Sequence, residues 1–276
     1  MSDALIITAA VNGAETMREQ NPNVPYTADE IAIEARRCRE AGAAMIHVHG
    51  RKTDGSPTQD RDTFGQILTA VRAQSDILVQ FSTGGAVWMD VEERIEALDL
   101  RPDMATLTTG TVNFGDDVFK NTIPMIKTIA SRLSEFGIRP EIEVFEIGMI
   151  DTALSLLAEG VLTAPLHFDF VLGVPGAMAA RPEYLDFLVT LLPSGSTWSV
   201  AGIGRHELPL AYKALEMGGH VRVGLEDNVY LAKGVFAQGS WELVQKVAER
   251  ARELGRRPVE PAEAKTILSL DRIKPS

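Results

Sequence analysis

Short apolar stretches alternate along the chain with longer stretches in which apolar residues recur every three or four positions. Continuous apolar runs are typical of parallel strands buried on both faces, whereas the longer period indicates amphipathic helices. The predicted strands cover 5–9, 45–49, 77–82, 104–108, 141–145, 166–171, 198–201 and 220–225. The predicted helices cover 28–41, 61–73, 91–98, 117–136, 150–158, 182–191, 208–217 and 240–254.

Eight strands that are each followed by a helix predict an α/β fold of the (β/α)8 TIM-barrel class. The alternative is an open, doubly wound sheet, which usually carries a glycine-rich phosphate-binding turn after its first strand. The sequence Val-Asn-Gly-Ala at 11–14 lacks that pattern, so the barrel is favoured. We expect residues 1–276 to form a single barrel domain, with a helical appendage at about 255–276 that closes it.

The composition limits the classes of partner. A net charge of −11 argues against non-specific binding to nucleic acids or to anionic membranes, although a local arginine cluster can still bind an anionic substrate. No apolar run is long enough to span a bilayer, and the first residues lack the basic segment of a secretory signal. The single cysteine, Cys38, has no partner for a disulfide, so we expect a cytoplasmic protein.

Two histidines, His47 and His49, stand at the end of the second predicted strand. Residues two apart on a strand share a face, so both imidazoles project to the same side. Barrel active sites lie at the carboxyl ends of the strands, and Glu226 follows the eighth strand, two positions round the barrel from the second. These three side chains could therefore converge as a His2Glu zinc site with an open position. The alternative is that Glu226 simply pairs with Arg222.

Other strand ends carry polar residues that could contact a ligand. Ser82 and Gly85 follow the third strand, and Thr106 lies in the fourth. Glu143 lies in the apolar fifth strand, where a carboxylate needs an arginine partner or a role in the site. Glu15 follows the first strand, and its alternative role is that of a solvated loop acid.

Several other kinds of chemistry fit the sequence less well. No predicted strand contains the lysine of a Schiff-base aldolase, and no G-x-S-x-G motif marks a serine hydrolase. Metal-dependent amidohydrolases carry H-x-H on the first strand, with further histidines on later strands. In this chain the H-x-H is on the second predicted strand, and the fifth has no histidine. His167 and His220 lie early in their strands and are expected to be structural. His206, which follows a weak G-x-G signal at 202–204, is a candidate ligand contact.

A series of motifs along nearly the whole chain resembles the β-keto acid cleavage enzyme family, once catalogued as a domain of unknown function. Within that family the chain is most similar to members that cleave 3-keto-5-aminohexanoate in lysine fermentation. The motifs that carry the resemblance lie at 8–15, 47–51 (His-Val-His-Gly-Arg), 80–85 (Gln-Phe-Ser-Thr-Gly-Gly), 104–107, 110–117, 141–144 (Glu-Ile-Glu-Val), 170–176, 201–205 and 224–228 (Gly-Leu-Glu-Asp-Asn).

The resemblance implies a zinc-dependent acyltransferase that converts a β-keto acid and acetyl-CoA into acetoacetate and a new acyl-CoA. It also implies a homotetramer. It assigns Asp227 as the general base and Glu15 as the partner of a substrate ammonium group. The implied zinc ligands are His47, His49 and Glu226, and the implied substrate-orienting residues are Arg222, Ser82, Gly85, Thr106 and Glu143.

Zinc at this site would polarise the substrate ketone and stabilise an enolate, so that a carboxylate can remove the C2 proton. We expect Arg222 to lower the pKa of Asp227, because an opposite charge nearby favours the ionised form. Two alternatives remain open. One is a different zinc-dependent barrel lyase or hydrolase, and the other is a barrel that binds metal without catalysis.

Overall fold

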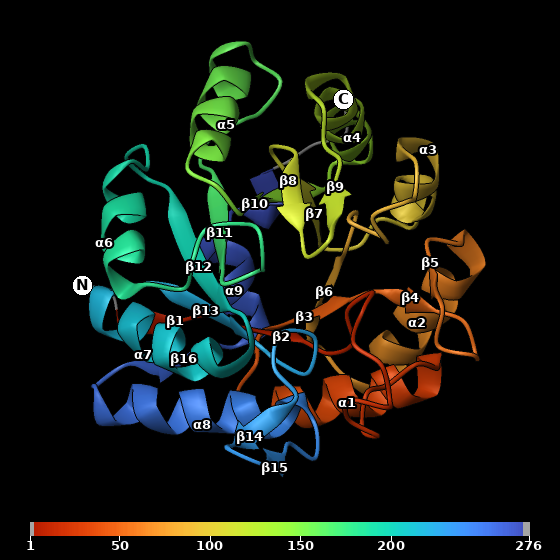
Figure 1. Cartoon of the computed structure of the whole chain (residues 1–276), viewed down its shortest axis with the longest axis vertical. Coiled ribbons are helices and arrows are strands. Elements are labelled where there is room, and N and C mark those ends of the chain that lie inside the picture. The colour runs from red at the N-terminus through yellow and green to blue at the C-terminus, as the bar shows by residue number, and fades with distance from the viewer. Residues whose placement is uncertain (1–2, 273–276) are drawn as a thin grey trace.

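The computed structural model describes residues 3–272, and its centre is a closed barrel of eight parallel strands (Figure 1). Each barrel strand pairs with the next along the chain, and the last pairs with the first. The barrel strands are β2 (Ile7–Ala10), β3 (Met45–Val48), β6 (Leu78–Phe81), β7 (Met104–Thr108), β10 (Arg139–Val144), β11 (His167–Leu172), β12 (Thr197–Gly202) and β13 (His220–Val223). The predicted TIM-barrel class is confirmed.

Helices surround the barrel, with α8 lying beside α1 so that the outer ring closes (Figure 1). The first helix begins with a capping box, in which Thr27 and Glu30 each bond the other's backbone N–H. The α-helices are α1 (Ala28–Ala41), α2 (Arg61–Gln74), α3 (Val91–Arg94), α4 (Ile123–Phe136), α5 (Gly148–Ala158), α6 (Pro182–Thr190), α7 (Glu207–Met217), α8 (Ser240–Glu253) and α9 (Pro261–Ile267). Short 3-10 segments are η1 (Glu96–Leu100), η2 (Gly204–His206) and η3 (Leu270–Arg272).

The amino-terminal end of the barrel is closed by the two ends of the described chain. The strand β1 (Ala4–Leu5) pairs in parallel with β16 (Arg257–Pro258), and α9 follows directly. Val259, Ala264 and Leu268 form a small apolar cluster with residues at the beginnings of the barrel strands, among them Met45 and Met104. The expected appendage is therefore helical only in part, and residues 273–276 lie outside the described range.

Three predicted elements differ from the structure. The predicted strand 5–9 is two strands, because Leu5 pairs with β16 whereas Ile7 begins the barrel strand. The predicted helix 91–98 is α-helical only to Arg94 and continues as a 3-10 segment. The predicted helix 117–136 begins at Ile123, with a proline in its first turn, because residues 117–119 pair as a strand instead.

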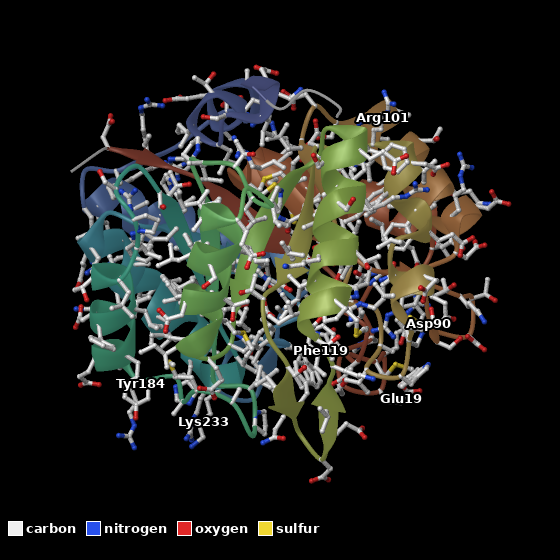
Figure 2. The ribbon with its side chains drawn as sticks, turned by 90° about the horizontal axis from the view of Figure 1, so that it is seen from above. Glu19, Asp90, Arg101, Phe119, Tyr184 and Lys233 are labelled. Carbon is white, nitrogen blue, oxygen red and sulfur yellow. The ribbon has the colours of Figure 1, made fainter. Side chains whose placement is uncertain are left out.

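Three antiparallel hairpins stand at the carboxyl ends of the barrel strands. They are β4 (Gly50–Arg51) with β5 (Pro57–Thr58), β8 (Val112–Phe114) with β9 (Asp117–Phe119), and β14 (Tyr230–Ala232) with β15 (Val235–Phe236). Figure 2 shows the β8–β9 hairpin projecting away from the barrel on the face opposite α9. Within residues 3–272, no helix combines the length and apolarity needed to cross a membrane.

Candidate active site

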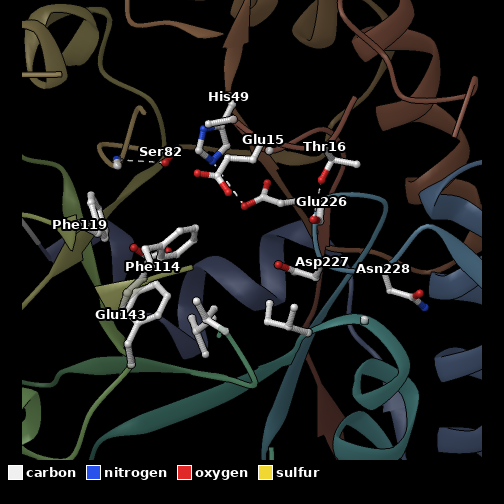
Figure 3. A pocket seen from close by; sticks show the side chains of 18 of the residues that line it. Glu15, Thr16, His49, Ser82, Phe114, Phe119, Glu143, Glu226, Asp227 and Asn228 are labelled. Carbon is white, nitrogen blue, oxygen red and sulfur yellow. Dashed lines mark hydrogen bonds and ion pairs between the residues drawn. The ribbon is translucent and has the colours of Figure 1, made fainter. Parts of the chain in front are cut away.

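A cavity of about 460 Å3 opens at the carboxyl ends of the barrel strands. Its base is polar and charged, and one wall is built largely from phenylalanine and valine side chains. Figure 3 shows Glu15 and Glu226 on the same side of the cavity as His49, with Phe114 and Glu143 across from them. The polar lining residues include His49, Ser82, Glu143, Arg222, Glu226 and Asp227, and the apolar ones include Val87, Phe114, Phe119, Phe145, Val171 and Val174.

Two histidines and a glutamate converge at the base of the cavity. The Nε2 atoms of His47 and His49 lie 3.5 Å and 3.4 Å from Oε1 of Glu226. One potential ligand atom from each of the three residues lies within 4.8 Å of the other two. Two imidazoles and one carboxylate are a ligand set that leaves a fourth position of a tetrahedral zinc ion open.

The polar atoms left without partners fit a cation. Nε2 of His47 and Oε2 of Glu226 are buried and make no hydrogen bond within the described residues. Nδ1 of His47 donates to Oε1 of Gln80 over 2.7 Å, which leaves the lone pair on Nε2, the atom that faces Glu226. Buried polar groups without partners are rare and costly, so these atoms favour a bound ion.

Backbone contacts fix the positions of these side chains. The side chain of the buried Asn12 bonds both the N–H and the carbonyl of His49, at 3.0 Å and 2.9 Å. Gly13 has φ +60°, and a Cβ at this position would lie 2.7 Å from Cγ of Glu226. Only glycine therefore allows both this backbone conformation and the close approach of the Glu226 side chain.

Arg222, on β13, lies among four carboxylates. Its guanidinium binds Asp227 through two hydrogen bonds of 2.9 Å and also donates to Glu226. It reaches Glu143 over 3.3 Å and lies 3.9 Å from Asp169. The predicted pairing of both Glu143 and Glu226 with an arginine is therefore present, and Glu226 faces the histidines as well.

Arg222 lowers the pKa of Asp227 as expected, but the net shift of that pKa is upward, opposite to the prediction. Burial raises the pKa of Asp227 to about 6, and the attraction of Arg222 only partly opposes this rise. Burial alone would also raise the pKa of Glu226, but Arg222 and the two histidines hold it well below its usual range. The adjacent carboxylates thus differ: Glu226 stays ionised, whereas Asp227 can take up a proton near neutral pH.

Two further acids, Glu143 and Asp169, lie beside Arg222. Glu143 accepts a hydrogen bond of 2.7 Å from Thr108, and burial raises its pKa. Asp169 is fully buried and accepts a 2.7 Å bond from Ser199. Burial, followed by repulsion from nearby Glu141, raises the pKa of Asp169 to about 8, so this acid is protonated at neutral pH.

Glu15 lies at the rim of the cavity on a rigid loop. The guanidinium of Arg51 fixes this loop by donating to the carbonyls of Asn12, Gly13 and Thr16. Partial burial, reinforced by Asp117, raises the pKa of Glu15, while Arg51 lowers it. No described side chain forms an ion pair or hydrogen bond with the Glu15 carboxylate, which therefore can interact with a ligand.

The remaining candidates divide into two groups. Ser82 and Gly85 line the cavity. Thr106 is fully buried and is not among the described lining residues, and its hydroxyl accepts the N–H of Thr83 over 3.0 Å. His206 likewise lies outside the described lining, beside Arg205.

The two strand histidines expected to be structural have structural partners. Nδ1 of His167 lies 2.8 Å from the hydroxyl of Thr197, and Nε2 lies 3.2 Å from Glu141. Nδ1 of His220 accepts the backbone N–H of Ile6 over 3.1 Å.

Sequence reasoning missed Gln80, Asn12 and Asp169. Each is a polar residue within or directly after an apolar strand, and that was the signal available. Their partners come from neighbouring segments: Gln80 contacts His47 and Asp169 contacts Ser199, each its register partner, and Asn12 contacts the backbone of His49.

The chain is similar to known proteins over nearly its whole length. Residues 4–270 match the sequence model of the beta-keto acid cleavage enzyme family. The chain is 51% identical to a 3-keto-5-aminohexanoate cleavage enzyme of Fusobacterium nucleatum, over 98% of this chain and 99% of the relative. It is 39% identical to a 3-oxoadipate:acetyl-CoA acetyltransferase of Cupriavidus necator, over 98% of this chain and 96% of the relative.

Among solved structures, the chain resembles the apo structure of ObcA with a TM-score of 0.80 and 22% identity. The match covers 90% of this chain and 66% of ObcA. At that identity the likeness supports the barrel fold alone.

Proposed function

The chain belongs to the β-keto acid cleavage enzyme family, and we propose that it transfers the acyl part of a β-keto acid to CoA in a zinc-dependent reaction. Acetyl-CoA is the co-substrate and acetoacetate the second product. The observation that carries the proposal is the placement of His47, His49 and Glu226 beside Asp227, with Arg222 bonded to both acids.

His47, His49 and Glu226 are the residues that would hold zinc. When bound, zinc supplies a Lewis acid that stabilises negative charge on the oxygens of the keto acid. In the variant His47→Ala we expect most of the bound metal and nearly all activity to be lost while the fold is kept. Elemental analysis before and after chelation measures this. Equally tight, stoichiometric zinc in the variant would contradict the ligand assignment.

Asp227 is the proposed general base. A carboxyl with a pKa of about 6 is mostly ionised at neutral pH and is a stronger base than an exposed aspartate. The bidentate contact with Arg222 fixes the orientation of the carboxylate, and the Oε1 atom of Glu143 contacts the same guanidinium. Ser82 and Gly85, which line the cavity, complete the proposed substrate-orienting set, whereas Thr106 supports it from behind through its two hydrogen bonds with Thr83.

The proposed reaction is a Claisen condensation followed by a reverse Claisen cleavage. Asp227 removes a proton from C2 of the β-keto acid, and C2 attacks the thioester carbon of acetyl-CoA. The CoA thiolate leaves and attacks the original ketone carbon of the adduct. Cleavage of the bond between that carbon and C2 then releases the new acyl-CoA, and C2 regains a proton to give acetoacetate.

We further propose that the substrate carries an ammonium group, as in 5-amino-3-oxohexanoate. The support is the Glu15 carboxylate, which faces the cavity without a partner among the described side chains, and the similarity to a 3-keto-5-aminohexanoate cleavage enzyme. When the amino group of the substrate is replaced by methyl, the ion pair with Glu15 is lost and the Glu15 carboxylate is left without a partner.

A substrate panel with acetyl-CoA tests this specificity. We expect kcat/KM for 5-amino-3-oxohexanoate to exceed that for 5-methyl-3-oxohexanoate by about tenfold or more. Equal values would leave the family reaction standing and refute the ammonium preference. Absence of acetoacetate formation from any β-keto acid would refute the reaction itself.

Three broader proposals remain: a role in lysine fermentation and a homotetrameric assembly, both supported by the family resemblance, and a cytoplasmic location, supported by the single cysteine. Sedimentation of the purified protein tests the assembly. Fractionation of the source cells tests the location, and loss of growth on lysine after gene deletion tests the pathway.

A further inference from the structure

The hairpin β14–β15 carries two stacked aromatic side chains at the rim of the cavity. The rings of Tyr230 and Phe236 have centroids 5.1 Å apart and planes 17° apart. Tyr230 also lines the cavity. Although large and apolar, the two side chains are 44% and 41% exposed. They form an aromatic surface that begins at the cavity and extends into solvent, and we call it the stacked pair.

The base of this hairpin is fixed by hydrogen bonds. Asn228 donates to Tyr230 O over 2.7 Å and to Glu207 over 3.1 Å, and its own Oδ1 accepts the N–H of Tyr230. Asn21 donates to the carbonyls of Val229 and Ala237, both over 2.9 Å. The stacked pair is therefore held in a fixed place, and Tyr230 follows the proposed base Asp227 by three residues.

The exposed charge at this hairpin differs from that of the other two hairpins at the cavity mouth. Residues 229–238 contain Lys233 and no acid, whereas the β8–β9 hairpin carries Asp116 and Asp117. The β4–β5 hairpin carries Arg51 and Lys52 with Asp54, but Arg51 is buried against backbone carbonyls, so its exposed charges are Lys52 and Asp54. Lys233 is exposed at the tip, makes no ion pair within the described residues, and lies on the mouth side of the barrel (Figure 2). In a chain of net charge −11, this is a local site for an anion.

We propose that the stacked pair and Lys233 bind the nucleotide end of acetyl-CoA, with the adenine on the exposed aromatic surface and a phosphate at Lys233. This inference rests on the proposed function. The thioester carbon must reach Asp227, but a cavity of about 460 Å3 that also holds the keto acid leaves no room for the nucleotide. The nucleotide must therefore lie outside the cavity, where base stacking on aromatic rings adds affinity.

The truncated thioester acetyl-pantetheine, which lacks the nucleotide, isolates this contact. For Phe236→Ala and for Lys233→Ala we expect kcat/KM with acetyl-CoA to fall about tenfold relative to kcat/KM with acetyl-pantetheine. Phe187→Ala on α6 and Lys265→Ala on α9 are the controls, because Phe187 is exposed and 43 residues before the hairpin, whereas Lys265 is 41% exposed on a helix at the opposite end of the barrel. In these controls the ratio should stay at the wild-type value.

A direct binding measurement separates this inference from the proposed reaction. Titration of the whole protein with 3′,5′-ADP in a calorimeter should show binding that Phe236→Ala weakens about tenfold and that added salt reduces. An unchanged thioester ratio in both hairpin variants would overturn the inference. So would a change of oligomeric state in Phe236→Ala with an unchanged ratio, because the aromatic surface would then join copies of the chain. A wild-type protein that binds 3′,5′-ADP but cleaves no β-keto acid would refute the proposed function alone.

Discussion

Gln80 lies directly behind His47: Nδ1 of the histidine donates to Oε1 of the glutamine over 2.7 Å, and both side chains are fully buried. The two residues are partners in the register of β3 and β6, so the barrel backbone itself sets their distance. This contact fixes the tautomer that leaves Nε2 free to bind a metal.

Replacing Gln80 by leucine should therefore weaken zinc binding about 10- to 100-fold, because the imidazole loses its acceptor and its orientation. Competition with a chromogenic chelator measures the affinity. Gln59→Leu is the matched control: Gln59 is also buried, but it donates to the Ser82 carbonyl and contacts no proposed ligand. If Gln80→Leu and Gln59→Leu bind zinc with equal affinity, Gln80 does not position His47.

Gly13→Ala should also reduce zinc affinity, because the new Cβ would lie 2.7 Å from Cγ of Glu226 and displace that carboxylate. Gly115→Ala provides a control for backbone strain. Its φ of +63° matches the +60° of Gly13, but a Cβ there would meet nothing within 4 Å. We expect both variants to lose stability and only Gly13→Ala to lose metal in the chelator competition. Metal loss in both would assign the effect to strain.

Asp227→Asn should bind zinc and keto acid but turn over about a hundred to ten thousand times more slowly, because the amide cannot accept the C2 proton. Exchange of the C2 hydrogens in deuterated water, followed by NMR without acetyl-CoA, isolates this step. If exchange continues at the wild-type rate, the base is another group, and Glu143 is the next candidate.

Glu15→Gln should abolish the preference for the amino-bearing keto acid without abolishing cleavage. The amide keeps the size of the side chain but removes the charge that attracts an ammonium group. The ratio of kcat/KM for 5-amino-3-oxohexanoate to that for 5-methyl-3-oxohexanoate should fall to about one. Glu19→Gln, an exposed change outside the described cavity lining, should leave the ratio as in the wild type.

His220 should make the fold less stable as the pH falls. Burial, with nearby His167 and Arg256, lowers its pKa to about 3, against about 6.5 in the unfolded chain. Between these values only the unfolded state holds the proton, so the free energy of unfolding decreases toward low pH by up to about 1.4 kcal/mol per pH unit. Urea titrations of wild type and His220→Gln should give a smaller pH slope for the variant.

The sequence was sufficient for the barrel and the convergence of the proposed ligands, because both depend on simple periodicities. Alternation along a strand places His47 and His49 on one face, and the order of strands in a barrel brings Glu226 near them. The single-domain organisation and the catalytic roles stay predictions.

Contacts that depend on strand register could not be predicted in the same way. Gln80 is opposite His47 only because β3 and β6 pair without a shift, and nothing in either segment alone fixes that pairing. The pKa of Asp227 was mispredicted for a related reason: a neighbouring arginine is visible in the sequence, whereas the depth of burial that outweighs it is not.

The pairing of β1 with β16 has a consequence for how the chain folds. Ala4 is the register partner of Arg257, and β2 needs β13 as its second neighbour. During synthesis, β2 can pair early with β3, but its other edge and the whole of β1 have no partner until almost the entire chain has been made. Contacts of such long sequence separation slow folding, and unpaired strand edges are prone to aggregate. The interval before β13 and β16 are made is therefore the stage at which the unpaired edges of the amino-terminal strands are most exposed to aggregation.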